Sequence, residues 1–184
     1  MPLEKNDAGL VTRAGQGDKK AFGDLYVRYM GNIYRYIYFK VSNQQDAEDL
    51  TEQVFLKAWK GLSSYRGDVP FKSWIFRIAH NTIVDHYRTR KESLPLQEDH
   101  WVSGQNYEME EKLLAEEQLN NLTGAISRLS PLHQDVLTLR FINGLSVRAV
   151  AEILDRSEGA VRVLQHRALQ AARALLIEGE AAGD

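Results

Sequence analysis

Apolar side chains recur at every third or fourth position through most of this chain, and that spacing is typical of amphipathic helices. One apolar stripe begins at Phe22 and a second at Leu50, while a third helix is predicted to begin near Pro70, whose fixed φ suits a first helical turn. The residues that these helices should bury are Phe22, Leu25, Tyr26, Tyr29, Ile33 and Ile37, then Leu50, Val54, Phe55 and Ala58, then Trp74, Ile75, Ile78, Ala79 and Ile83. No segment keeps the alternation of a strand, so the sequence predicts an all-α fold.

The helical pattern is interrupted once, near the middle of the chain. There the sequence becomes polar and is punctuated by Pro95 and Gly104, which is typical of a linker. We therefore predict two small helical domains, at residues 1–92 and 112–184, joined by a flexible linker at residues 93–111.

Serine residues mark the predicted helix starts in the second domain. Ser130 precedes Pro131, Ser146 precedes a short apolar-periodic segment, and Ser157 precedes a longer one; serine is a preferred N-cap residue. Asn143-Gly144 and Asp155-Arg156 supply the stops and turns between these helices. An earlier apolar-periodic segment runs through Leu113, Leu119, Leu122 and Ile126.

A short capped helix, a tight turn and a longer capped helix form the pattern of a helix-turn-helix, whose second helix would enter the major groove of DNA. If Val161, Leu164 and Ala168 face the core, the helical period places an outward face on the other side of the last helix. That face consists of Glu158, Gly159, Arg162, Val163 and His166. Gly159 would let the backbone approach DNA, and Arg162 suits a bidentate contact with guanine. The alternative is an ordinary helical hairpin with solvated arginines.

Charge is segregated along the chain, although the net charge is only −2. Cations outnumber acids between residues 66 and 91 and again between residues 156 and 173, while residues 98–117 are acidic. A low net charge argues against a nucleic-acid binder, but two basic surfaces separated by an acidic connector predict a bipartite one, with acidic segments left for a protein partner.

Aromatic and basic residues alternate around the third helix. The aromatic residues are Tyr65, Phe71, Trp74, Phe76 and Tyr87, and the basic ones are Arg66, Lys72, Arg77, Arg88 and Arg90. Single-stranded DNA is bound by this combination, through base stacking and phosphate neutralisation. A core position remains the default for Trp74. The acidic residues at the start of the second helix, Asp46, Glu48, Asp49 and Glu52, suit either a helix start or a basic partner surface.

Catalytic and metal chemistry have little support. The chain has no cysteine. His80 and His86 are six residues apart, whereas the histidine pair of a zinc-binding helix is four apart, and Asp85 between them does not complete a metal-binding motif. No phosphate loop or nucleophile elbow occurs, so we expect neither an enzyme nor a cofactor. No signal peptide or apolar run of about 20 residues occurs, so we expect a cytoplasmic protein without membrane insertion.

Three ordered runs resemble the sigma-70 family of RNA polymerase sigma factors, in its extracytoplasmic-function group. Residues 46–59 resemble region 2.2. Residues 65–68, followed by Phe71, Trp74, Arg77-Ile78-Ala79 and Asn81, resemble regions 2.3 and 2.4. Residues 129–154 and then 157–162 resemble regions 4.1 and 4.2. The resemblance covers roughly residues 8–176 and implies sigma region 2 in the first domain and sigma region 4 in the second.

The resemblance also implies partners and roles. The partners would be core RNA polymerase, through its β′ clamp helices and β flap, promoter DNA, and an anti-sigma factor. The polymerase-binding residues would be Asp46, Glu48, Asp49 and Glu52. The residues for the minus-10 element would be Tyr65, Arg66, Trp74, Arg77, Asn81 and Arg88, with Tyr65 and Asn81 lining the pocket for a flipped base. The residues for the minus-35 element would be Arg156, Glu158, Gly159, Arg162, Val163, His166 and Arg167, with Arg167 on phosphate.

Two other classes of protein stay open at this point. A stand-alone helix-turn-helix repressor or activator would need a dimer interface to present paired half-sites, and the sequence contains no heptad repeat that would supply one. A two-domain adaptor that binds only protein would show no salt-dependent DNA affinity.

Overall fold

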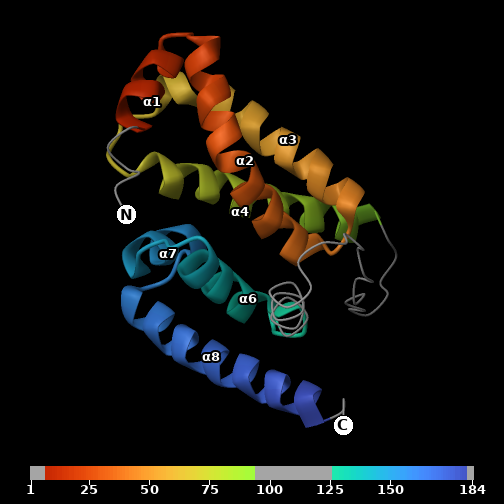
Figure 1. The fold of residues 1–184 in the computed structure, drawn as a ribbon. Helices are drawn as coiled ribbons and strands as arrows, with labels where there is room; N and C mark the ends of the chain where they lie inside the picture. The colour runs from red at the N-terminus through yellow and green to blue at the C-terminus, as the bar shows by residue number, and fades with distance from the viewer. Residues whose placement is uncertain (1–6, 94–125, 182–184) are drawn as a thin grey trace. The chain divides into compact units, whose positions relative to one another are not determined.

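The computed structural model describes residues 7–93 and 126–181, which lie in two compact units (Figure 1). Within these residues the regular elements are helices and there is no strand, which confirms the all-α prediction. Each unit is described by itself below. The predicted linker lies outside the described residues except for Ser93, and so does the apolar segment before Ile126.

The first unit contains α1 (Asp7–Gly15), α2 (Lys19–Val41), α3 (Gln44–Gly61), the 3₁₀ turn η2 (Leu62–Ser64) and α4 (Phe71–Ser93). Local capping explains where these helices begin. The Asp18 carboxylate accepts from the amides of Lys20 and Ala21 at the start of α2, and hydrogen bonds from backbone amides and from Arg13 lower the pKa of Asp18. The Asn43 side chain accepts from the amide of Asp46 at the start of α3.

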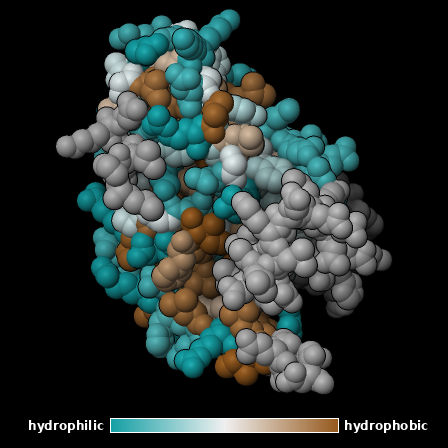
Figure 2. Space-filling view, viewed as in Figure 1, coloured by the Kyte–Doolittle hydropathy of each residue, from teal (hydrophilic) through white to brown (hydrophobic). Residues whose placement is uncertain are grey.

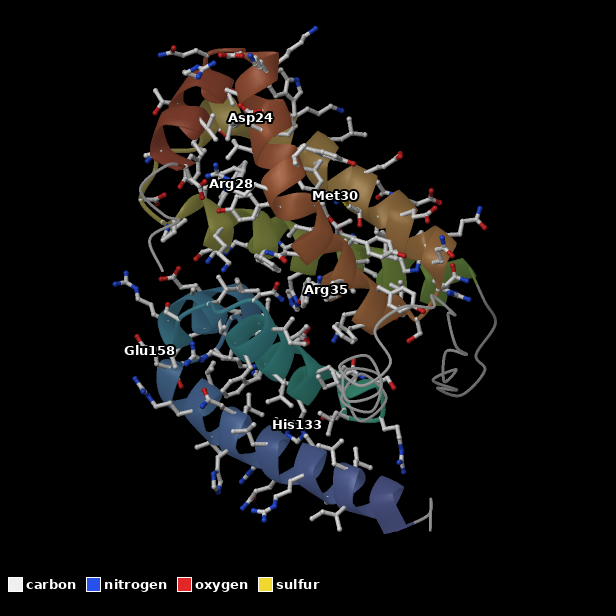
Figure 3. All side chains as sticks on the ribbon, in the orientation of Figure 1. Asp24, Arg28, Met30, Arg35, His133 and Glu158 are labelled. Carbon is white, nitrogen blue, oxygen red and sulfur yellow. The ribbon has the colours of Figure 1, made fainter. Side chains whose placement is uncertain are left out.

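Helices α2, α3 and α4 enclose the core of the first unit, and α1 packs against α2 at one end (Figure 1). Tyr36 and Phe76 are fully buried and meet edge to face, with ring centroids 5.7 Å apart. Asp7 attaches α1 to α2, because its carboxylate accepts from the Arg28 guanidinium and the Tyr29 hydroxyl; Figure 3 labels Arg28 on α2.

The predicted core of the first unit needs four corrections. Phe22, Trp74 and Ile78 are half-buried rather than buried, and Tyr26 is 38% exposed. Phe76 is fully buried beside Ile75 instead. The reason is that these four side chains lie at the edges of the apolar stripes of α2 and α4, where each stripe borders solvent.

The second unit contains α6 (Pro131–Leu137), the π-helical turn η3 (Thr138–Ile142), α7 (Val147–Leu154) and α8 (Glu158–Ala181). The predicted caps at Ser146 and Ser157 are confirmed, since their hydroxyls accept from the amides of Ala149 and Ala160, each at 3.1 Å. Ser130 occupies the N-cap position of α6, but its side chain makes no capping hydrogen bond.

The helix that ends at Asn143 finishes in a π-helical turn, which the periodicity did not predict. The Asn143 amide donates to the Thr138 carbonyl at 2.9 Å, and Gly144 follows with φ 63°. Such turns insert an extra residue into a helix and are frequent at functional sites. Here the turn leaves Phe141 53% exposed.

Helices α6 and α7 pack on α8 (Figure 1). Val161 and Ala168 are fully buried, as predicted, whereas Leu164, Ala171 and Leu175 are partly exposed. Hydrophobic surface remains on both units in the space-filling view (Figure 2). Among the side chains that the structure describes, the large apolar ones that stay exposed are Tyr26, Val27, Met30, Leu56, Val84, Phe141, Val163, Leu169 and Ile177.

Candidate nucleic-acid interfaces

The turn between α7 and α8 has the geometry of a helix-turn-helix. Asp155 adopts a left-handed conformation with φ 52°, and the Arg156 amide donates to the Ala151 carbonyl at 2.9 Å. Ser157 then caps α8, and Glu158 lies at the first turn of that helix (Figure 3). The prediction of two capped helices joined by a tight turn is therefore confirmed.

The predicted outward face of α8 is exposed at each of its residues, which are Glu158, Gly159, Arg162, Val163 and His166. Arg156, before the helix, and Arg167, beside this face, are exposed as well. Within the unit, a Cβ atom at Gly159 would meet only the Ser157 hydroxyl, at 3.9 Å. Since packing does not require a glycine there, the missing side chain leaves room for close approach from outside.

Arg162 is held by an acid one turn before it. Its guanidinium lies 3.2 Å from the Glu158 carboxylate, with side chains 66% and 48% exposed. An exposed pair of this kind contributes little stability. The pair instead aligns the guanidinium along the outward face of α8, and any guanine contact by Arg162 must compete with Glu158.

Arg140 ties the π-helical turn to α8. Its guanidinium donates to the Gln165 side chain at 3.2 Å and to the Leu145 carbonyl. Gln165 stands beside His166 on the helix that carries the outward face. Arg140 therefore helps to orient that face, a role that no sequence signal identified.

A second exposed stripe runs along α4. Arg77, Asn81 and Arg88 follow Trp74 at intervals of three, four and seven residues, so the four project from one side of the helix. Arg77, Asn81 and Arg88 are exposed and Trp74 is half-buried. The predicted minus-10 residues on this helix thus share one surface. Val84, 50% exposed, lies on the same stripe.

Tyr65 packs against the start of this stripe. Its ring lies 5.0 Å from Trp74 and 6.2 Å from Phe71, centroid to centroid, and its hydroxyl donates to the Val69 carbonyl. Burial raises the pKa of Tyr65, and the carboxylates of Asp68 and Asp7 add to the shift. The ring packing and the hydrogen bond to Val69 hold the aromatic ring in place beside Trp74.

Tyr65 and Asn81 do not share one hollow. Tyr65 and Arg66 line a hollow of about 530 Å³ together with α1, and Asn81 is not among its lining residues. Trp74 connects the two positions, because it contacts Tyr65 and lies two turns before Asn81 on α4.

The acidic residues at the start of α3 separate into two groups. Glu48, Asp49 and Glu52 are exposed on one side of the helix. Asp46 instead lies 3.8 Å from Arg90 and 4.0 Å from His86, both on α4. The sequence could not distinguish these positions, because all four carboxylates suit a helix N-terminus equally well. Leu56, 58% exposed on the same helix, was not predicted as a surface residue.

The histidines of α4 serve contacts within the protein. His80 Nδ1 lies 3.1 Å from the Tyr36 hydroxyl, and His86 faces Asp46. Across residues 7–93 and 126–181, no three His, Cys, Asp or Glu side chains gather where they could hold a metal ion. None of the helices in these ranges has the length and hydropathy needed to cross a membrane.

Comparison with protein families assigns both helical units. Residues 25–93 match the family described as Sigma-70 region 2, and residues 125–174 match Sigma-70, region 4. The chain belongs to the sigma-70 family. Sigma factors are the transcription initiation factors that direct RNA polymerase to promoters.

Individual relatives of this sigma factor come from the ECF group. The chain is 37% identical over 171 residues to the ECF RNA polymerase sigma factor BldN of Streptomyces coelicolor, covering 91% of this chain and 64% of that protein's length. It is 33% identical over 173 residues to the ECF RNA polymerase sigma-E factor of Haemophilus influenzae, covering 88% of this chain and 90% of that one.

A solved structure shares the fold. The sigma factor RpoE of Bartonella quintana, in complex with the anti-sigma factor NepR, superposes with a TM-score of 0.67 at 20% identity, covering 85% of this chain and 97% of that chain. In this sigma factor, the region 2 match contains α3, Tyr65 and α4, and the region 4 match contains the helix-turn-helix.

Proposed function

We propose that this sigma factor reads a promoter through two separate surfaces, the α4 stripe for the minus-10 element and the outward face of α8 for the minus-35 element. The observation that carries the proposal is that the helical members of each predicted set share one side of their helix. Arg77, Asn81 and Arg88 are exposed on one side of α4, with Trp74 and Tyr65 packed together at its start. On α8 the exposed residues of the shared side are Glu158, Gly159, Arg162, Val163 and His166. Tyr65, Arg66, Trp74, Arg77, Asn81 and Arg88 form the first set, and Arg156, Glu158, Gly159, Arg162, Val163, His166 and Arg167 form the second.

The exposed acids of α3 are the proposed contact with the β′ clamp helices of core RNA polymerase, and the second unit is the proposed contact with the β flap. Glu48, Asp49 and Glu52 carry the clamp contact, whereas Asp46 is engaged by Arg90 and His86. An anti-sigma factor that covers the DNA surfaces is a further proposed partner. The Bartonella sigma factor, which shares the fold, was solved in complex with an anti-sigma factor. The role is non-enzymatic and cytoplasmic.

The direct test mixes the chain with core RNA polymerase and promoter templates. We expect promoter-specific transcripts from the mixture, and weak duplex binding by the chain alone, because two small faces joined by a tether need core polymerase to position them. Tight, sequence-specific binding by the isolated chain as a dimer would instead indicate a repressor. Absence of both transcripts and salt-dependent DNA binding would indicate a protein adaptor.

Charge reversal at Asp49 tests the polymerase contact. Asp49→Lys should raise the dissociation constant for core polymerase by about tenfold at low salt, because a carboxylate facing a basic surface becomes a repulsive cation. Loss of its helix-dipole interaction is worth only about 0.3 to 1 kcal/mol, so thermal unfolding should change little. Titration of labelled core polymerase measures the binding.

The graded control is Asp49→Asn, which removes the charge without reversing it and should give an intermediate defect. Raising the salt concentration should shrink both defects, because exposed charges are screened. If Asp49→Lys binds core polymerase as well as the wild type does, the acidic face is merely the start of α3.

A further inference from the structure

A lysine of α3 lies at the edge of the α4 stripe. The Lys57 ammonium donates to the Thr82 hydroxyl at 3.1 Å and lies 3.7 Å from the Asp85 carboxylate. Two and a half turns separate Lys57 from Glu48, so the two project to opposite sides of α3. Lys57 therefore belongs to the surface of α4 rather than to the acidic face of its own helix.

Asp85 brings a second cation to the same place. One carboxylate oxygen lies 3.2 Å from the Arg88 guanidinium, and the other faces Lys57. Asp85 follows Asn81 by one helical turn, so the carboxylate stands next to the stripe that carries Asn81 and Arg88. Two cations from different helices are thus gathered around one acid, which leaves the trio with a net charge of +1.

Fold stability does not account for this arrangement. The Lys57, Asp85 and Arg88 side chains are 47%, 49% and 71% exposed, and exposed ion pairs contribute little. Thr82 is 2% exposed and donates its own hydroxyl proton to the Ile78 carbonyl, so its oxygen is oriented to accept from Lys57. The lysine is held in place while its charge stays accessible to solvent.

We propose that Lys57 and Arg88 bind phosphate of the promoter strand whose base is presented to Asn81, and that Asp85 is the positioning residue that holds both cations beside it. The inference rests on the proposed role of α4 and extends the DNA surface of region 2 onto α3. An ammonium offers three donors as a compact point charge, which suits a phosphate oxygen. The contact is independent of sequence, so it adds affinity and register, not base preference.

Salt dependence tests the Lys57 contact. Promoter fragments are titrated with holoenzyme assembled from core polymerase and each variant, and the logarithm of the binding constant is plotted against the logarithm of salt concentration. Lys57→Ala should reduce the slope by about 0.7 to 0.9, the value of one lost phosphate contact, and should weaken all minus-10 variants equally. Lys57→Arg should keep the wild-type slope.

Two further variants make the test specific. Lys57→Gln keeps a group that can donate to Thr82 and loses only the charge, so it should match Lys57→Ala in slope. Lys60→Ala, three residues later on α3 and also exposed, removes the same charge from outside the Lys57, Asp85 and Arg88 cluster and should leave the slope unchanged. An unchanged slope in Lys57→Ala, or an equal loss in Lys60→Ala, overturns the phosphate contact.

Asp85→Asn separates positioning from repulsion. Removal of an acid that merely repels DNA would strengthen promoter binding, whereas loss of the anchor for Lys57 and Arg88 should weaken it; stronger binding therefore overturns the positioning role.

Failure of the proposed promoter-reading function would give a different result from failure of this inference. If wild-type holoenzyme shows no promoter-specific binding, the proposed role of α4 is wrong. If wild-type holoenzyme binds the promoter normally, and Arg88→Ala lowers the salt-dependence slope but Lys57→Ala does not, only the Lys57 contact is wrong.

Discussion

Arg162→Ala is expected to weaken holoenzyme binding at the minus-35 element by about 1 to 3 kcal/mol, or roughly 5- to 150-fold, and to relax preference at one base pair. The physical reason is a bidentate contact between the guanidinium and a guanine edge, from a side chain that is 66% exposed and aligned by Glu158. Competition between promoter fragments that differ at single minus-35 positions measures both effects.

The matched comparison is Arg167→Ala, on the same helix and also exposed. We propose that Arg167 contacts phosphate, so its loss should weaken every minus-35 variant alike and lower the salt slope by about 0.9. If Arg162→Ala also weakens all variants equally, then Arg162 is a phosphate contact and the base is read by another residue.

Asn81→Ala should abolish discrimination at one minus-10 position, a loss of about 1 to 3 kcal/mol if the amide makes a good paired contact with a base edge. The side chain is exposed on α4, and alanine is a strong helix former, so the variant should stay folded and bound to core polymerase. A flipped base gives up stacking and pairing, which a pocket can offset with stacking and edge hydrogen bonds.

A template that is already unpaired at that position separates base reading from melting. It removes the cost of opening the duplex but cannot restore a missing hydrogen bond, so the loss of discrimination should persist. Val84→Ala is the matched control, since Val84 is 50% exposed on the same stripe and has no polar group. Full recovery of base preference by Asn81→Ala on the premelted template would show that Asn81 acts in melting or packing.

Much of the region 4 surface could be predicted from the sequence because its determinants are local. The caps at Ser146 and Ser157 are hydrogen bonds between residues three apart, and the outward face of α8 follows from the helical period once Val161 and Ala168 face the core. The π-helical turn before Asn143 was not predicted. Its contacts include the Arg140 hydrogen bonds to Gln165 and to the Leu145 carbonyl, and these connect separate segments of the chain.

In region 2 the helical spacing by itself predicted α2, α3 and α4 and the residues that lie along the α4 stripe. It did not predict α1 (Asp7–Gly15), a helix of nine residues. Only the tertiary structure determined which charged side chains of α3 face α4. It turned Asp46 from the acidic face of α3 toward Arg90 and His86, and it brought Lys57 from that helix to Asp85. It also left Trp74 half-buried beside Tyr65. These outcomes depend on which sides of α3 and α4 pack together. A period of 3.6 residues shows which residues share one side of a helix, but it does not show which other helix packs against that side.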